Sequence, residues 1–311
     1  MTSTRPATRQ LPAPGTTAAT SRTRRRRSLA SRRSNLLTLG MLALLIYFLL
    51  PLFWLFVAST KTTGDLFSSF GLWFADDFAL LSNIRQTFTY DGGVYGRWML
   101  NTLFYSVVSA GGAAFLAALG GYGFAKYRFR GNNLLFALVL GSIMVPTTAL
   151  AIPTYLLFSK VGMVNTPLAI ILPSLVSPFG LFLMRIYAQD AIPDSLIEAG
   201  RIDGAGEMRI FFQLALRTLA PGFVTVLLFT LVATWNNYFL PLIMLNNPNL
   251  YPITVGLAAW SSQTAGGGGS TGELVALVVT GSMLSVIPLI AAFLLLQRYW
   301  QSGLSAGGVK A

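Results

Sequence analysis

The chain has 311 residues, of which 54% are hydrophobic and only 10% charged, and its formal net charge is +12. Soluble globular chains carry about 25% charged residues, so this composition favours a protein embedded in lipid. The sequence contains no His and no Cys. That excludes imidazole proton relays, thiol catalysis, disulfides and Cys/His metal sites.

The N-terminal segment concentrates positive charge. Nine of the 22 basic residues lie in the first 33 positions, where no acidic residue occurs. They are interleaved with Ser, Thr, Ala and Pro, which cannot bury enough apolar surface to fold. We therefore expect residues 1–35 to form a disordered basic tail that fixes topology and attracts anionic lipid, and no nucleic-acid partner.

Six apolar stretches are long enough to cross a bilayer, since about 20 helical residues span its hydrocarbon core. They lie near residues 36–57, 101–125, 134–158, 167–184, 219–245 and 275–297. The first stretch is longer than the apolar core of a signal peptide, about 7 to 15 residues, which predicts an uncleaved helix. The fold class expected is all-α integral membrane, with six transmembrane helices.

The basic residues predict the orientation of these spans. Most of them fall on one side: the N-terminal group, Lys126, Arg128, Arg130, Arg185, Arg201, Arg209, Arg217, Arg298 and Lys310. The opposite side has Lys61, Arg85, Arg97 and Lys160, together with Asp65, Asp76, Asp77, Asp91 and Glu273. We expect both termini to be cytoplasmic.

Helix breakers and small residues occur within the predicted spans. Prolines that we expect to interrupt them are Pro146, Pro153, Pro173, Pro178, Pro241 and Pro288. Such breaks are tolerated where neighbouring helices or a water-filled cavity satisfy the freed carbonyls. Small residues between Gly111 and Gly121 predict close packing of the second span against a neighbour. Ordinary bundle packing and a pathway lined by helix breaks both remain open.

The polar segment between the fourth and fifth spans is predicted to have its own structure. Ser195 and Glu198 have the spacing of a capping box that starts a short helix, and Gly204 provides its stop. Leu196, Ile197, Ala199 and Ile202 predict one apolar side of this helix, and Asp194, Glu198 and Arg201 predict local ion pairing. Such a helix either lies on the membrane surface or docks into a groove on a partner.

Residues Glu198-Ala199-Gly200-Arg201-Ile202-Asp203-Gly204-Ala205, followed by Phe211, Leu216 and Pro221, resemble the E-A-A-x-x-D-G-A loop of binding-protein-dependent ABC importer permeases. Two positions depart from the family pattern. Gly200 replaces the usual second Ala, and Arg217 replaces a Pro that many members have. Gly200 should loosen the helix by about 1 kcal/mol relative to Ala.

Two further stretches are similar to carbohydrate permeases of the MalG-like type. They are Trp235-Asn236-Asn237-Tyr238-Phe239-Leu240-Pro241-Leu242 with Pro252 to Leu257, and the tail from Gln297 to Lys310. The resemblance covers roughly residues 36–311. It implies a type I ABC importer permease in a bacterial cytoplasmic membrane, with a first helix and outer loop over residues 36–97, the type-1 transmembrane domain over 98–297 and a cytoplasmic tail over 298–311.

The resemblance also implies partners and roles. It implies a homologous MalF-like second permease, a dimer of MalK-like ATPase subunits that bind ATP and Mg, and an extracytoplasmic sugar-binding protein. Glu198, Ala199, Gly200, Asp203, Gly204 and Ala205 would then form a coupling helix that contacts the ATPase. Gly307, Gly308 and Lys310 in the tail would add a second contact with it.

The sequence itself indicates that energy comes from another chain. No ionisable residue lies deep in the predicted spans, although proton- or sodium-driven carriers need such groups. No phosphate loop of the G-x-x-x-x-G-K-[ST] type occurs, so we expect no cofactor in this chain and no enzyme activity of its own. A self-contained secondary carrier and a non-transporting membrane scaffold are the alternatives.

Candidate pathway residues are Trp235, Asn236, Asn237 and Tyr238, which offer an aromatic face, amides and a hydroxyl suited to sugars. The alternative is that both aromatic residues belong to an interfacial belt and both Asn cap a kinked helix. The outer segment 246–272 contains no charge and includes a Gly-rich run at 266–270. It reads either as a loop that reaches the binding protein or as a disordered linker.

Overall fold

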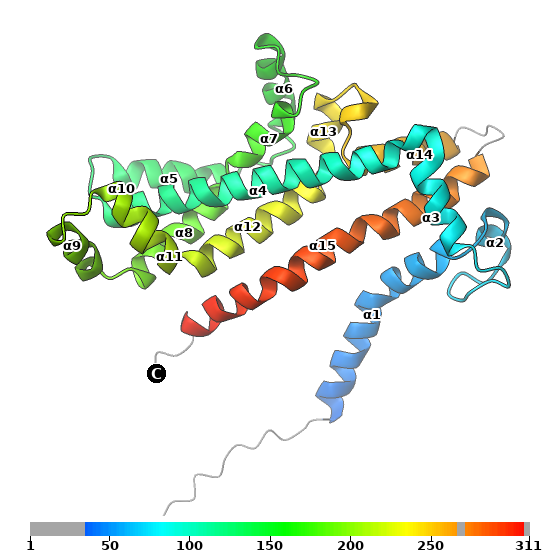
Figure 1. Ribbon diagram of the computed structural model, residues 1–311, viewed down its shortest axis with the longest axis horizontal. Helices are drawn as coiled ribbons and strands as arrows, with labels where there is room; N and C mark the ends of the chain where they lie inside the picture. The colour runs from blue at the N-terminus through cyan, green and yellow to red at the C-terminus, as the bar shows by residue number, and fades with distance from the viewer. Residues whose placement is uncertain (1–34, 266–270, 308–311) are drawn as a thin grey trace, which may run out of the picture. The chain divides into compact units, whose positions relative to one another are not determined.

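The computed structural model describes residues 35–265 and 271–307, and these residues contain helices and no strand (Figure 1). The helices are α1 (Asn35–Ser59), α2 (Thr63–Ser68), α3 (Leu80–Thr89), η1 (Tyr90–Gly93), α4 (Val94–Lys126), α5 (Asn132–Ile143), α6 (Ala151–Lys160), α7 (Leu168–Leu175), α8 (Pro178–Ala191), α9 (Asp194–Ile202), α10 (Glu207–Ile210), η2 (Phe211–Ala215), α11 (Leu216–Thr218), α12 (Ala220–Trp235), α13 (Phe239–Met244), η3 (Pro248–Leu250), α14 (Ile253–Ala265) and α15 (Thr271–Gly307). The all-α prediction is confirmed.

The chain divides into two compact units, Met1–Phe48 and Leu49–Ala311. Within the first unit, the described residues are the start of α1, and their side chains are exposed. The expected first span, residues 36–57, falls within this single 25-residue helix. The helix is apolar throughout and long enough to cross a membrane.

Helix α4 is the central element of the second unit and packs against α7, α8 and α12. Its glycines allow close approach, as the sequence predicts. A Cβ atom added to Gly121 would lie 2.6 Å from the Cβ of Met184 in α8, and one added to Gly112 would lie 2.3 Å from Leu175 Cδ2 in α7. At Gly121 the nearest atoms include the α8 backbone, at 2.7 Å, so only glycine permits this helix spacing, whereas at Gly112 the Leu175 side chain could shift.

The far end of α4 is joined to α14 and α15 by an aromatic cluster. Tyr95 and Trp98 pack with Trp260, and the rings of Trp98 and Trp260 are 4.9 Å apart between centroids. The Tyr95 hydroxyl donates to the Gly281 carbonyl at 2.8 Å. Helix α14 forms the 13 residues Ile253–Ala265 of the expected outer segment 246–272, while the Gly-rich run at 266–270 lies outside the described residues.

Four described helical stretches are long and apolar enough to cross a membrane, and a fifth is counted if the pair Glu207–Thr218 and Ala220–Trp235, bent by 78°, forms one span. The expected span 134–158 is not one continuous helix. It is divided into α5 and α6 by a nonhelical stretch that contains Pro146. The six-span count therefore stays a prediction.

The other prolines that were expected to interrupt helices occupy different positions in them. Pro178 begins α8 after a break at residues 176–177, and Pro241 lies in α13 after the break that ends α12. Pro153 and Pro173 lie within α6 and α7. The expectation that Pro288 interrupts the last span is wrong, because Pro288 lies inside the continuous helix α15.

Candidate functional site

The polar segment after α8 folds into the short helix α9, as expected, but the cap differs from the prediction. The N-cap residue is Pro193, in an extended conformation, and no side chain caps the first turn. Ser195 lies inside that turn, so the predicted capping box is wrong. Pro193 keeps the preceding Ile192 extended, and with Pro193 itself extended the helix begins at Asp194, earlier than a helix capped by Ser195 would.

The end of α9 has the expected glycine. Gly204 has φ = +78° and follows the C-cap residue Asp203. The Gly204 N–H donates to the Arg201 carbonyl and the Ala205 N–H donates to the Gly200 carbonyl, both at 3.0 Å. This pair of bonds is the Schellman motif, which satisfies the last free carbonyls of a helix.

One face of α9 packs against the rest of the second unit. Ile197 is 6% exposed and joins a core cluster that includes Ile210 and Phe211. Gly200 is also buried, and a Cβ atom there would lie 3.2 Å from both Ile210 Cγ1 and Leu214 Cδ1. Gly200, where the family usually has Ala, therefore lies at a close contact between α9 and the segment that contains Ile210 and Leu214.

The predicted apolar side of α9 is only partly correct. Leu196 and Ile197 face inward, but Ala199 is exposed and Ile202 is 85% exposed. Met208, just beyond the Gly204 turn, is 61% exposed. The helix thus has a second apolar strip that nothing in the described chain covers.

The predicted local ion pairing on α9 is wrong. Asp194 pairs with Lys126 at the end of α4, with 2.8 Å between Nζ and Oδ1, and Arg201 pairs with Glu207, with 2.7 Å between Nε and Oε1. The Lys126 ammonium group lowers the pKa of Asp194 by a hydrogen bond and by its charge. Helical spacing could not reveal these pairs, because each joins α9 to another helix.

Glu207 adds a second link between this region and the end of α4, through Tyr127. The Tyr127 hydroxyl donates to its Oε2 atom at 2.5 Å, while Arg201 donates to Oε1. Neither Glu207 nor Tyr127 was singled out from the sequence. The sequence signal that could have revealed the Arg201–Glu207 pair is the presence of these opposite charges on either side of the Gly204 turn.

Four of the six residues that the family resemblance marks for contact with an ATPase are exposed. Glu198, Ala199, Asp203 and Gly204 are exposed, Ala205 is half-buried and Gly200 is buried. Among the described residues, no ion pair or side-chain hydrogen bond involves the Glu198 carboxylate. The arrangement holds a small helix rigidly by one face and leaves a carboxylate and an apolar strip on the other.

The candidate pathway residues lie at the break between α12 and α13. Trp235 is buried and its indole N–H donates to the Ser285 carbonyl of α15 at 3.2 Å. Asn236 is the C-cap residue of α12, and its side-chain amide donates to the Val232 carbonyl at 2.9 Å. The Asn237 carbonyl accepts from the Thr254 hydroxyl. Only Tyr238 presents an exposed ring.

The tail residues are described only in part. Helix α15 ends at Gly307, whereas Gly308 and Lys310 lie outside the described residues. Within the part of the chain that the structure describes, no group of acidic residues could hold a metal ion.

A known protein family matches most of this chain, including the loop that contains α9. Residues 110–305 match the model of the family described as binding-protein-dependent transport system inner membrane component. The range contains α9, the α12–α13 break and nearly all of α15.

Several characterised relatives share most of the chain. The arabinooligosaccharides transport system permease protein AraQ of Bacillus subtilis is 32% identical over 88% of this chain and 95% of its own length. The lactose transport system permease protein LacG of Rhizobium radiobacter is 28% identical over 84% of this chain and 90% of its own.

A solved structure shares the fold. A chain in the crystal structure of a bacterial ABC transporter involved in the import of the acidic polysaccharide alginate aligns with a TM-score of 0.73. The alignment covers 86% of this chain and 95% of that one, at 22% identity. At this identity the match supports the fold.

Proposed function

Because the chain belongs to the family of binding-protein-dependent transport system inner membrane components, we propose that it is a permease subunit of an ATP-driven sugar importer. The substrate class that we propose is an oligosaccharide. Relatives named for arabinooligosaccharides, for lactose and for melibiose, raffinose and stachyose support this class. Such a subunit forms half of the translocation pathway, and a homologous permease forms the other half.

The observation that carries the proposal is the way α9 is held. Its buried face, with Ile197 and Gly200, packs on the core, and Lys126 and Glu207 hold its two ends through Asp194 and Arg201. Its exposed face presents Glu198 and Ile202. A helix fixed in this way can transmit the movement of a docked ATPase to α4 as a rigid-body displacement.

Partners and placement follow as parts of the same proposal. A pair of ATPase chains binds and hydrolyses ATP on the cytoplasmic side and contacts α9, and the tail that includes Gly307, Gly308 and Lys310 adds a contact. An extracytoplasmic binding protein delivers the sugar. Both termini are cytoplasmic, in a bacterial cytoplasmic membrane.

The role of the α12–α13 break is a further part of the proposal. Tyr238 is the pathway candidate that the geometry favours, because its ring is exposed. Trp235 and Asn236 instead support the break, the first through its bond to α15 and the second as a helix cap.

The test uses the complete transporter in proteoliposomes, with uptake of a labelled sugar and ATP hydrolysis measured in parallel. The variant is Glu198→Gln combined with Gly204→Ala, and the control is Asp190→Asn, which removes one exposed carboxylate from α8. We expect the double variant to assemble with its partners but to lose the coupling of hydrolysis to uptake. The control should retain both activities.

Two results would contradict the proposal. One is normal uptake and normal sugar-stimulated hydrolysis in the double variant, which would remove α9 from the coupling. The other is sugar uptake by the purified chain alone in liposomes without ATP, which would identify a secondary carrier. A chain that copurifies with neither an ATPase nor a second permease would favour a scaffold.

A further inference from the structure

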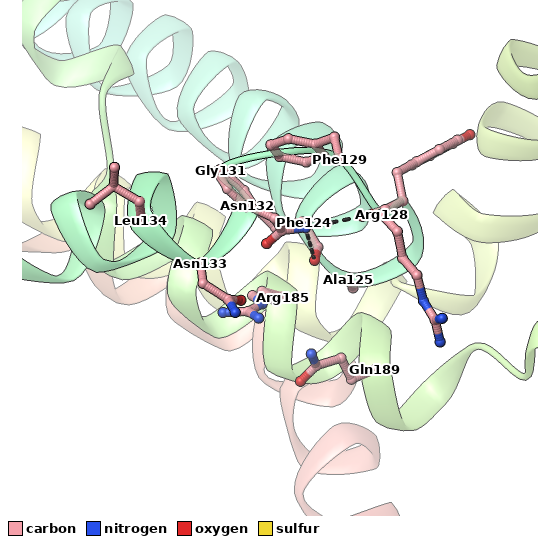
Figure 2. Close-up of a pocket in the computed structure, with 11 residues that line it drawn as sticks. Phe124, Ala125, Arg128, Phe129, Gly131, Asn132, Asn133, Leu134, Arg185 and Gln189 are labelled. Carbon is pink, nitrogen blue, oxygen red and sulfur yellow. Dashed lines mark hydrogen bonds between the residues drawn. The ribbon is translucent and has the colours of Figure 1, made fainter.

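A pocket of about 400 Å³ lies beside the cytoplasmic end predicted for α4, and neither α9 nor the α12–α13 break contributes a lining residue. Its walls are the end of α4, the loop 127–131, the start of α5 and the last turns of α8 (Figure 2). The residues that line it are Phe124, Ala125, Tyr127, Arg128, Phe129, Gly131, Asn132, Asn133, Leu134, Arg185 and Gln189.

Two buried polar atoms of this lining have no hydrogen-bond partner in the described structure. They are Nε of Arg185, a donor, and Oδ1 of Asn132, an acceptor. The Asn132 amide donates to the Tyr127 carbonyl at 3.0 Å, which fixes its orientation. Because buried polar atoms are normally paired, the two atoms indicate a ligand with both an acceptor and a donor.

The Arg185 guanidinium is positioned, not free to move away. Its Cζ atom lies 3.7 Å from the centroid of the Phe136 ring in α5, a cation–π contact that covers one of its faces. Figure 2 shows its nitrogen atoms beside the amide of Asn133, with Gln189 on the next turn of α8. These side chains offer several N–H donors in one place.

The charge around the pocket is positive. Arg128 and Arg185 line it, and none of the lining residues is acidic. Asp194 is paired with Lys126, the Glu207 carboxylate accepts from Arg201 and from the lining residue Tyr127, and Asp190 follows Gln189 on an exposed position of α8. The N-terminus of α5, which no side chain caps, adds the positive end of a helix dipole.

An apolar surface continues directly from the polar pocket. Leu134, a lining residue, is 66% exposed, and Leu138, one turn further along α5, is 62% exposed. A soluble anion would need only the polar part. A polar, cationic pocket followed by exposed leucines on a membrane helix fits an amphiphile with an anionic head and acyl chains.

We propose that this pocket binds the phosphate of an anionic phospholipid, with acyl chains along α5. Arg185, Asn133 and Arg128 bind the phosphate oxygens, because guanidinium groups form strong charge-assisted bonds with phosphate. Asn132 Oδ1 accepts from a headgroup hydroxyl, such as that of phosphatidylglycerol. The lipid would hold α5 against α8 at the inner leaflet. The proposal rests on the predicted orientation of the spans in the membrane, which places this pocket at the cytoplasmic side, and does not depend on which substrate is transported.

The test measures lipid retention by native mass spectrometry on the purified complete transporter. Phosphatidylglycerol and phosphatidylcholine with identical acyl chains are the two lipid probes, and inorganic phosphate is the third. The variants are Arg128→Gln, on an exposed loop position, and Arg185→Lys, which keeps the charge but loses the planar donors. The control is Arg217→Gln, an exposed arginine on the same predicted side that makes no contact with the pocket.

The wild-type chain should retain phosphatidylglycerol in preference to phosphatidylcholine. Each pocket variant should weaken that retention about tenfold, the effect of losing one charge-assisted bond, and the control should leave it unchanged. Equal retention in Arg128→Gln, Arg185→Lys and Arg217→Gln would overturn the proposal. Displacement of the lipid by millimolar inorganic phosphate would overturn the lipid source and indicate a soluble phosphate. Since uptake is not measured, the outcome is separate from that of the coupling test.

Discussion

Replacing Gly204 by Ala should destabilise the end of α9 through backbone strain alone. Gly204 has φ = +78°, and nothing lies within 4 Å of a Cβ atom built there, so the substitution introduces no clash. Gly206, two residues later, is also open, but its φ is −70°. The two Gly→Ala variants therefore differ chiefly in whether the backbone must adopt a left-handed conformation.

The expected magnitude follows from that difference. A left-handed conformation costs an L-residue about 1 to 2 kcal/mol, whereas the loss of chain entropy in the unfolded state favours Ala by about 0.4 to 1 kcal/mol at both sites. The entropic effect cancels when the variants are compared. Gly206 is also the N-cap of α10, where Ala is less favourable than Gly, so Gly206→Ala has a cost of its own and the measured difference is a lower bound on the strain at Gly204.

Hydrogen exchange of the peptide that contains α9 measures this difference. A cost of about 1 to 2 kcal/mol raises the population of the locally open state roughly 5- to 30-fold. Gly204→Ala should therefore exchange faster than Gly206→Ala, and Gly204→Asn should recover part of the protection because Asn tolerates the left-handed region. Equal exchange in Gly204→Ala and Gly206→Ala would refute the strain argument.

Two further predictions concern α4. Gly121→Ala should lower the free energy of unfolding by about 1 to 3 kcal/mol, because its Cβ atom would lie 2.6 Å from Met184 Cβ. Thermal melting measures the effect, and the control is Gly123→Ala, whose Cβ atom would have nothing within 4 Å. Equal melting temperatures of the two variants would contradict the prediction. The lowered pKa of Asp194 beside Lys126 means that the pair stabilises the fold fully above the unfolded aspartate's pKa and progressively less as the pH falls through the folded one. Melting temperatures measured between about pH 7 and about pH 3 should therefore fall more steeply in the wild type than in Lys126→Gln, and parallel profiles would argue against the pair.

The features of the site that were predictable from the sequence are those with a local cause. Gly204 is required by a backbone conformation that few other residues adopt, so the end of α9 was predictable, whereas its start was wrongly assigned to a cap at Ser195. The small residues of α4 likewise indicated a close helix contact before the partner helix was known. In each case the physical cause lies within a few residues of its effect.

The features that were not predictable depend on residues far apart in the chain. Lys126 and Asp194 are 68 positions apart, and only the packing of α8 on α4 brings them together. The local spacing of Asp194, Glu198 and Arg201 suggested a competing set of pairs, which the tertiary contacts replace. The sequence assigned Ile202 to the same apolar side as Leu196 and Ile197, yet the core cluster takes only these two and leaves Ile202 exposed.

The position of α4 explains how a short loop can act on a large bundle. Its last residue, Lys126, holds α9, while Tyr95 and Trp98 near its start anchor α14 and α15. The 33 residues of α4 form one helix, about 50 Å long at 1.5 Å per residue. Because a Cβ atom at Gly121 would lie 2.7 Å from the backbone of α8, α4 and α8 are closely packed, and we expect a displacement of α9 to move them together.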